Sequence, residues 1–429
     1  MPEKGHGTLP ESDPDHAQLW LAIEDYRAAS ETREPDTLDT IILKVTNRCN
    51  EACKHCYDAC GFDDADMDAG HMASLVEEAL ALSGPHLNLL FHGGEPFLRT
   101  DTLDEVATHA RTVADRLGKT IGCFAQTNAS VMNDRIVAML QKHDFGLGIS
   151  LDGWESLHDE LRVMHDGSGT YRLFQRSMDR YGEYLVNNSG IMTTVMATNV
   201  KVLREVVRHV RDLGFVTWDA TLFDLNGRGA LFPQMEVTPQ AYCAALDDLL
   251  DGIEEGEFDG IAIKPILRRL DNLLLAERLD MCLPGNNGCG AGSRLLSVSA
   301  EGTISGCDII HNRALSLGQS PAATLEDALA HPAAGQMRER LSRNLAGCHS
   351  CTWLGQCGGT CLARGGLNAV DPLDCATSKF INEALLRRLA QSDALLDWYA
   401  RFPPQRRRAS VIQETRAFFS ESRKVLETA

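Results

Sequence analysis

Three cysteines near the N-terminus, Cys49, Cys53 and Cys56, have the spacing C-x3-C-x2-C. Three thiolates this close can bind three irons of a cubane iron–sulfur cluster and leave the fourth iron without a protein ligand. An open coordination site is typical of metal centres that do chemistry, as in catalytic zinc sites. A zinc ribbon instead pairs two C-x2-C units, so a zinc knuckle or a chance group of buried thiols is the weaker alternative.

The cysteines directly follow Thr40–Thr46, a segment whose mostly apolar, β-branched residues predict a buried strand. They therefore lie on the loop at the carboxyl end of a first strand, where α/β barrels and open α/β sheets place their active sites. Further strand patterns occur at Leu87–His92, Thr120–Gln126, Gly146–Leu151, Ile191–Ala197 and Val216–Leu222, and amphipathic segments at Met72–Ala81, Leu103–Leu117, Asp134–Lys142 and Val202–Leu213. This alternation predicts a parallel sheet of six βα units with right-handed crossovers.

The composition restricts the class of protein. The chain of 429 residues has a formal net charge of −19, which argues against a nucleic-acid or anionic-membrane surface, because phosphate binding needs a basic face. We interpret the short basic run Arg406–Arg408 as solvated charge at a helix end. No apolar run approaches the ~20 residues of a membrane span, and the acidic N-terminus does not resemble a signal peptide. We therefore expect a cytoplasmic protein with neither a nucleic-acid nor a membrane partner.

Fourteen cysteines in such a chain favour metal binding or catalysis, since reducing compartments disfavour disulfides. Besides the triplet, eight crowd into the C-terminal half, at Cys282, Cys289, Cys307, Cys348, Cys351, Cys357, Cys361 and Cys375. Eight thiols suffice for two fully ligated [4Fe–4S] clusters, and a pair of zinc sites is the alternative that spacing leaves open. Cys60, Cys123 and Cys243 stand apart, and we interpret them as small, partly buried apolar residues.

A cysteine loop of this spacing after a first strand resembles that of the radical SAM enzymes. The resemblance implies a [4Fe–4S] cluster on Cys49, Cys53 and Cys56, whose open iron binds the amino and carboxylate groups of S-adenosylmethionine (SAM). It also implies reductive cleavage of SAM to a 5′-deoxyadenosyl radical that abstracts hydrogen from a substrate. The family usually places an aromatic residue near the adenine just before the third cysteine, and here that position is His55.

Further motifs of the family follow the predicted strands. The second strand ends in the run Gly93, Gly94, Glu95 and Pro96, which matches the GGEP motif that receives the SAM amino group. Glycines at such a strand end let the backbone approach a ligand closely. By the same resemblance, Ser150 at the end of the fourth strand contacts the ribose of SAM.

The resemblance also implies that Arg162 pairs with the SAM carboxylate, for which a planar guanidinium is well suited. A surface ion pair on a helix is the alternative for this residue. Asn128 and Asp152 are expected as neighbours of the SAM site, and Met196 as part of an apolar wall for the adenine. A plain core position is the alternative for Met196.

The C-terminal cysteines resemble the SPASM extension of radical SAM enzymes in order and spacing. The resemblance implies one auxiliary [4Fe–4S] cluster on Cys282, Cys289, Cys307 and Cys361, and a second on Cys348, Cys351, Cys357 and Cys375. Cys361 crosses back to the first set, so the two sites must fold together. Full ligation leaves no open iron, which favours electron transfer over substrate binding. Between Cys357 and Cys361 the chain reads Gly-Gly-Thr, where the family often reads x-Gly-Gly.

Asp308 directly follows Cys307. In the sulfatase-maturating members of the family, an aspartate in this position is proposed to deprotonate the substrate residue. A carboxylate near the clusters could serve as a general base if burial raised its pKa toward neutrality. The alternative is an aspartate that caps a helix or stabilises a turn.

Together these features predict an α/β fold, a partial (β/α)6 radical SAM barrel with a C-terminal cysteine-rich SPASM extension. The expected divisions are an acidic flexible segment at 1–37, the barrel at 38–235, a helical bridge at 236–281, the SPASM auxiliary-cluster domain at 282–380 and a helical tail at 381–429. Additional helices are expected at Gln18–Ala29, Phe380–Leu396 and Val411–Leu426.

The leading hypothesis for the function is a radical SAM/SPASM maturase that abstracts hydrogen from a residue of a ribosomally synthesised peptide, giving a crosslink or another oxidised product. One alternative is an anaerobic sulfatase-maturating enzyme that forms formylglycine from Cys or Ser. Another is a multi-cluster electron-transfer protein, which would need neither the GGEP run nor Arg162. The expected partners are a peptide or protein substrate and an external one-electron donor of the flavodoxin or ferredoxin type. No pattern specifies an oligomeric state.

Overall fold

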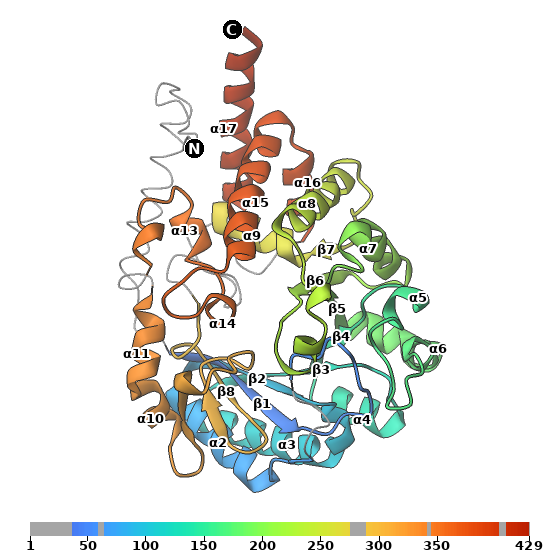
Figure 1. The fold of residues 1–429 in the computed structure, drawn as a ribbon, viewed down its shortest axis with the longest axis vertical. Helices are drawn as coiled ribbons and strands as arrows, with labels where there is room; N and C mark the ends of the chain where they lie inside the picture. The colour runs from blue at the N-terminus through green and yellow to red at the C-terminus, as the bar shows by residue number, and fades with distance from the viewer. Residues whose placement is uncertain (1–36, 59–63, 275–288, 341–344, 403–408, 429) are drawn as a thin grey trace.

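The computed structural model describes residues 37–58, 64–274, 289–340, 345–402 and 409–428. Their strands form one ten-stranded sheet in the order β10-β9-β8-β1-β2-β3-β4-β5-β6-β7 (Figure 1). The strands are β1 Leu38–Thr46, β2 Ser83–Gly93, β3 Thr120–Thr127, β4 Phe145–Ser150, β5 Ser189–Val195, β6 Thr217–Leu222, β7 Ala262–Ile263, β8 Leu295–Val298, β9 Thr303–Ser305 and β10 Ser316–Gln319.

The first seven strands are parallel and follow one another around the sheet in chain order. All their carboxyl ends therefore meet at one edge. β1 pairs with β2 on one side and with β8 on the other, both in parallel. Eight of its nine residues are buried, as expected for a strand covered on both faces. Lys44, near its carboxyl end, is buried although its side chain is charged.

Helices connect the parallel strands and cover the outer side of the sheet (Figure 1). Local signals define their ends: the Asp68 side chain caps the first turn of α2, Asn133 caps α4, and Gly118 ends α3 in the left-handed conformation. The helices between the strands are α2 Ala69–Leu82, α3 Thr100–Leu117, α4 Asp134–Lys142, α5 Glu155–His158, α6 Tyr171–Asn188, α7 Leu203–Asp212, α8 Pro239–Glu254 and α9 Lys264–Leu274, with 3-10 turns η1 Pro96–Arg99, η2 Val200–Val202, η3 Gly227–Leu231 and η4 Pro233–Met235.

The C-terminal part adds short strands and helices to this sheet. β9 pairs antiparallel with both β8 and β10, so the cysteine-rich region continues the sheet beyond β1. α15 packs against α8 and α9, at the opposite end of the molecule from α2 and α3 (Figure 1). The remaining elements are α10 Leu325–Ala330, α11 Pro332–Arg338, α13 Leu354–Cys357, α14 Leu362–Gly365, α15 Pro372–Gln391, α16 Ala394–Ala400 and α17 Ala409–Thr428, with η5 Arg313–Leu315 and η6 Ala346–Cys348.

The structure confirms the predicted α/β class and the six strand–helix units, with strand ends within a few residues of those expected. The single helix predicted at Phe380–Leu396 is wrong in its bounds. Asp371 caps a helix that begins at Pro372, and extended backbone at Ser392 separates α15 from α16. The helix predicted at Gln18–Ala29 lies outside the described residues. Within the described ranges, no helix has the length and apolarity that crossing a membrane requires.

Candidate functional site

The loop that carries Cys49, Cys53 and Cys56 leaves the carboxyl end of β1, as the sequence predicts. Backbone hydrogen bonds from Ala52 N to Val163 O (2.7 Å) and from Lys54 N to Leu161 O (2.8 Å) attach it to the segment after β4. The Cys53 carbonyl also accepts a hydrogen bond from the Arg228 guanidinium (2.9 Å) in the loop after β6. Neighbouring strand ends therefore fix the shape of the cysteine loop.

The thiols of this loop fit an iron–sulfur cluster in their chemistry. Burial raises the pKa of Cys49 to about 12, with further contributions from Glu95 and the other acidic groups nearby. Burial also raises the pKa of Cys53, and Glu51 and the other two thiols of the triplet add to the effect. Such thiols stay protonated unless a metal binds them as thiolates. These three residues are therefore the ones that could hold a catalytic cluster.

No three histidine, cysteine or acidic side chains within the described ranges could hold a single metal ion. The ligands of a cubane bind separate irons and need not converge on one point.

The glycines of the GGEP motif bring the end of β2 against the cysteine loop. A Cβ on Gly94 would collide with the Arg48 carbonyl and lie 3.1 Å from the Cys49 nitrogen, and Gly93 has a φ of +133°. Gly94 N donates to Thr46 O (2.7 Å). We expected the glycines to allow a ligand to approach. The structure shows that they allow the protein's own backbone to approach.

Glu95 of the motif joins the ends of β2 and β3. Its carboxylate accepts hydrogen bonds from the Thr127 hydroxyl (2.8 Å), the Asn128 nitrogen (2.9 Å) and the Phe97 nitrogen (3.2 Å). Burial raises the pKa of Glu95 to about 7, although these donors oppose the shift. Pro96 opens the turn that follows.

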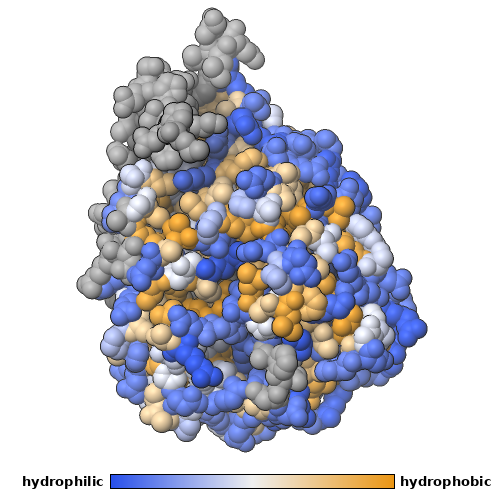
Figure 2. Space-filling model, viewed as in Figure 1, coloured by the Kyte–Doolittle hydropathy of each residue, from blue (hydrophilic) through white to orange (hydrophobic). Residues whose placement is uncertain are grey.

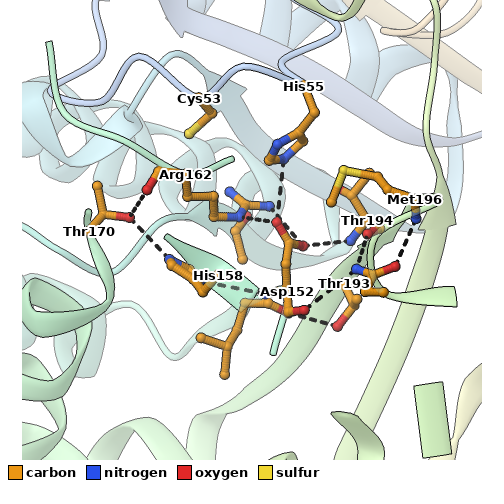
Figure 3. A network of polar contacts seen from close by, with 12 residues as sticks. Cys53, His55, Asp152, His158, Arg162, Thr170, Thr193, Thr194 and Met196 are labelled. Carbon is orange, nitrogen blue, oxygen red and sulfur yellow. Dashed lines mark hydrogen bonds and ion pairs between the residues drawn. The ribbon is translucent and has the colours of Figure 1, made fainter. Parts of the chain in front are cut away.

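Arg162 and Asp152 form a buried ion pair beside the cysteine loop (Figure 3). Arg162 Nε donates to Asp152 Oδ2 (2.6 Å), and Thr194 N donates to Asp152 Oδ1 (2.8 Å). Burial alone would raise the pKa of Asp152, but the neighbouring guanidinium holds it below its ordinary value. Arg162 is therefore buried, and the alternative considered from the sequence, a surface ion pair on a helix, is wrong. Its carboxylate partner within the chain was not predicted.

Two buried histidines complete this network. His55 Nε2 lies 3.5 Å from Asp152 Oδ2, and His158 accepts from Asp152 N (3.3 Å) and contacts the Thr170 hydroxyl (3.1 Å; Figure 3). Burial lowers the pKa of His55 to about 4 and that of His158 to about 3, so both are neutral near pH 7. The only full positive charge that these residues place beside Asp152 is therefore that of Arg162.

The other predicted SAM contacts also lie at the carboxyl ends of strands. Asn128 donates to the Asn50 side chain (3.0 Å) within the cysteine loop. The Ser150 hydroxyl accepts from Gln126 Nε2 (3.0 Å). The Met196 side chain is buried in a small cluster with Leu161 and Phe223, separate from the main core.

Asp308 lies in a turn after β9, where it meets the barrel. Its carboxylate accepts a hydrogen bond from the Tyr57 hydroxyl (2.6 Å) and lies 3.4 Å from the Cys307 sulfur. The Asp308 carbonyl accepts from Lys44 Nζ (3.1 Å), which also pairs with Asp58 (2.7 Å). Burial would raise the pKa of Asp308, but His92, Lys44 and Tyr57 hold it below its ordinary value. The carboxylate is therefore ionised near pH 7, and burial does not raise its pKa toward neutrality.

Tyr57 and Lys44 were not predicted as site residues from the sequence. A signal was present for each: Tyr57 directly follows Cys56, and Lys44 interrupts an apolar strand just before the cysteine loop.

Four C-terminal cysteines surround one hollow. Cys348, Cys351, Cys357 and Cys375 line it together with Gly359, Thr360 and other residues. These are the four cysteines that the resemblance assigns to the second auxiliary cluster, and a lining of four thiols suits an iron–sulfur cluster. Cys375 reaches this hollow from the first turn of α15, and Cys357 from the last turn of α13.

Three members of the other predicted set lie within the described residues, and Cys282 lies outside them. Burial raises the pKa of Cys361 to about 12, with contributions from Asp374 and from Cys289 nearby. Cys307 follows β9. Of the isolated cysteines, Cys123 is buried in β3 and Cys243 is half-buried on α8, as expected, and Cys60 lies outside the described residues.

Replacing Gly94 with alanine tests the contact between β2 and the cysteine loop. Because the new methyl group would displace Arg48 next to Cys49, we expect Gly94→Ala to bind less iron per chain than wild type after anaerobic reconstitution. Gly260→Ala is the control, since a methyl group there meets no atom within 4 Å. Equal iron in wild type and Gly94→Ala would show that the contact does not shape the loop.

Replacing Asp152 with asparagine tests the buried ion pair. We expect the free energy of unfolding to fall by about 3–5 kcal/mol, because Arg162 is left as an uncompensated buried charge. The double variant Asp152→Asn, Arg162→Met should regain part of this loss. Asp134→Asn removes an exposed ion pair with Arg180 and should cost less than about 1 kcal/mol. Denaturant titrations that gave Asp152→Asn the same small cost as Asp134→Asn would contradict the assignment.

Comparison with known proteins agrees with this geometry. Residues 43–220 match the model of the radical SAM superfamily. The chain is 30% identical to the uncharacterized protein MJ0907 of Methanocaldococcus jannaschii over 42% of its own length and 60% of that protein's length. It is 21% identical to a cysteine-type anaerobic sulfatase-maturating enzyme of Clostridium perfringens (76% of this chain, 88% of the relative). It is 22% identical to the radical SAM cyclopropyl synthase TigE of Paramaledivibacter caminithermalis (85% and 79%).

Two solved structures share the fold. Native anSMEcpe with bound AdoMet superposes with a TM-score of 0.72 at 19% identity, over 85% of this chain and all of that one. Streptococcus suis SuiB bound to the precursor peptide SuiA gives a TM-score of 0.57 at 15% identity, over 87% and 84%. With the cysteine triplet, the GGEP run and the parallel sheet arranged as described, residues 43–220 form a radical SAM domain, and the chain is similar in sequence to an anaerobic sulfatase-maturating enzyme and to a radical SAM cyclopropyl synthase.

Proposed function

We propose that this enzyme is a peptide maturase with three [4Fe–4S] clusters, which oxidises a residue of a ribosomally synthesised peptide to form a crosslink or a related product. The observation that carries the proposal is the hollow lined by Cys348, Cys351, Cys357 and Cys375 in a chain that also has the open triplet on β1. Four cysteines can ligate a cluster fully, whereas three leave an iron for SAM. The combination suits an oxidation in which the substrate loses an electron after it loses hydrogen.

The relatives support a peptide substrate. SuiB has been solved with its precursor peptide SuiA, and anSMEcpe with the Cp18Cys peptide. Figure 2 shows apolar side chains gathered over the middle of the face where the sheet meets the C-terminal helices. Such a surface suits an extended peptide better than a small polar metabolite.

Bound at the triplet, a [4Fe–4S] cluster and SAM would supply a 5′-deoxyadenosyl radical that abstracts hydrogen from the substrate. The chain's own residues would hold SAM and orient it. The Arg162–Asp152 pair presents a fixed guanidinium beside Cys53, and the GGEP segment fixes the strand end next to Cys49. Asn128 and Ser150 add polar groups on β3 and β4, Met196 adds an apolar surface after β5, and His55 stays neutral at the adenine position.

Asp308 is proposed as the residue that takes a proton from the substrate. It is ionised, so it can accept a proton, and Tyr57 and Lys44 orient it where the cysteine loop meets the C-terminal region. An external one-electron donor of the flavodoxin or ferredoxin type would reduce the catalytic cluster.

The second candidate function is formylglycine formation in a sulfatase. The Asp308–Tyr57 hydrogen bond favours it, because this oxidation also requires loss of a proton from a Cys or Ser side chain. Sequence identities of 21–28% to such enzymes do not distinguish the two reactions. Electron transfer without SAM chemistry is disfavoured, since residues 43–220 match the radical SAM superfamily.

The catalytic role of the triplet can be tested with Cys53→Ala. We expect reduced, reconstituted wild type to release 5′-deoxyadenosine from SAM and Cys53→Ala to release only background amounts, measured by liquid chromatography. Cys243→Ala removes a thiol outside all three predicted cluster sites and should retain wild-type release. Comparable release from Cys53→Ala and wild type would refute the assignment of the triplet.

Asp308→Asn separates proton removal from radical formation. Because general base catalysis contributes about 10²–10⁴-fold, we expect modification of a co-expressed peptide from a neighbouring reading frame to slow by at least about 10²-fold. Release of 5′-deoxyadenosine should continue. Tyr57→Phe keeps the carboxylate and should slow modification less. Wild-type modification by Asp308→Asn would exclude Asp308 as the base.

A further inference from the structure

The segment from Cys357 to Cys361 joins the two predicted auxiliary cysteine sets, because Cys357 belongs to one and Cys361 to the other. Its three inner residues all have positive φ angles: Gly358 +63°, Gly359 +91° and Thr360 +69°. Glycine adopts this conformation freely, but a β-branched threonine there is strained. The backbone between the two sets therefore keeps its shape only if the surrounding structure holds it.

Arg340 is the side chain that holds this crossover segment. It is 4% exposed and donates four hydrogen bonds, all to backbone carbonyls. Nη1 donates to Gly359 O (2.9 Å) and Thr360 O (3.1 Å), Nε to Gly366 O (2.7 Å) and Nη2 to Ala369 O (2.7 Å). Gly359 and Thr360 line the four-cysteine hollow, so the guanidinium lies directly behind its wall. No carboxylate is among these acceptors, so none of these hydrogen bonds neutralises the charge.

The Arg340 charge lies close to both sets. Its Nη1 donates to the carbonyls of Gly359 and Thr360, which lie between Cys357 of one set and Cys361 of the other. Gly359 and Thr360 also line the hollow together with Cys357. A fixed cation near an all-cysteine cluster favours its reduced state, because one-electron reduction adds one negative charge to the cluster.

We propose that Arg340 is a positioning residue shared by both auxiliary clusters. Its planar guanidinium holds the strained crossover segment between the two cysteine sets, and its charge raises the reduction potentials of the clusters that these cysteines bind. This inference rests on the proposed three-cluster content. The electron that each cluster accepts comes from the substrate radical or from the external one-electron donor.

The test compares charge and geometry in separate variants of the full chain after anaerobic reconstitution. Arg340→Gln removes the charge, and Arg340→Lys keeps the charge but lacks the planar guanidinium group. The double variant Arg340→Gln, Thr360→Gly lets the crossover adopt positive φ without strain. Arg388→Gln is the matched control, because Arg388 is also buried but pairs with Glu254, Asp247 and Asp251 instead of the crossover. The readouts are iron per chain and the midpoint potentials from a redox titration followed by electron paramagnetic resonance.

We expect at least one auxiliary midpoint potential to become more negative in Arg340→Gln, with the potential of the triplet cluster unchanged. Arg340→Lys should keep potentials near wild type but bind less iron. The double variant should recover iron while its potential stays low, and Arg388→Gln should match wild type in both. Unchanged iron and potentials in Arg340→Gln, with about twelve irons in wild type, would overturn this inference alone. Only about four irons in wild type would overturn the three-cluster proposal and this inference with it.

Discussion

The structure depends on how the cysteine loop after β1 is held in place. Three thiols on a short loop can serve one cluster only if the backbone between them has one conformation. Hydrogen bonds from Ala52 and Lys54 to the segment after β4, the close packing of Gly94 on Arg48, and the Arg228 guanidinium on Cys53 O supply that constraint. Each contact comes from the carboxyl end of a different strand, so the curved parallel sheet is what assembles the loop.

At the same edge of the sheet, burial and pairing determine which side chains carry a charge. Asp152 and Arg162 neutralise each other beside the loop, and the two buried histidines near them stay neutral. Next to Cys56, Tyr57 donates a hydrogen bond to the Asp308 carboxylate, and Lys44 donates one to the Asp308 backbone carbonyl. The cysteine loop and the residue after it therefore contact both a neutralised ion pair from the barrel and a carboxylate from the extension. β8 brings the extension to this place, because it pairs directly with β1.

Much of this arrangement could be predicted from the sequence. The apolar strands, the GGEP run and the cysteine spacings are local patterns, and the rule that parallel strands share one edge then places their ends together. The partners of Arg162 and Asp308 could not be predicted in the same way. Asp152 and Tyr57 meet them across 10 and 251 positions of the chain, and only the fold shows which side chains face each other. The role of Gly94 in packing against Arg48 was hidden for the same reason.

Mass spectrometry of a candidate substrate can show whether this enzyme oxidises a peptide. Reconstituted, reduced enzyme would be incubated with SAM and with short peptides encoded beside its reading frame, and each peptide would be fragmented to locate any change. We expect one peptide to become lighter by two hydrogen atoms, with the change at defined residues and absent with Cys53→Ala. Peptides of unchanged mass, from an enzyme that releases 5′-deoxyadenosine and converts a Cys or Ser of a sulfatase to formylglycine instead, would contradict it.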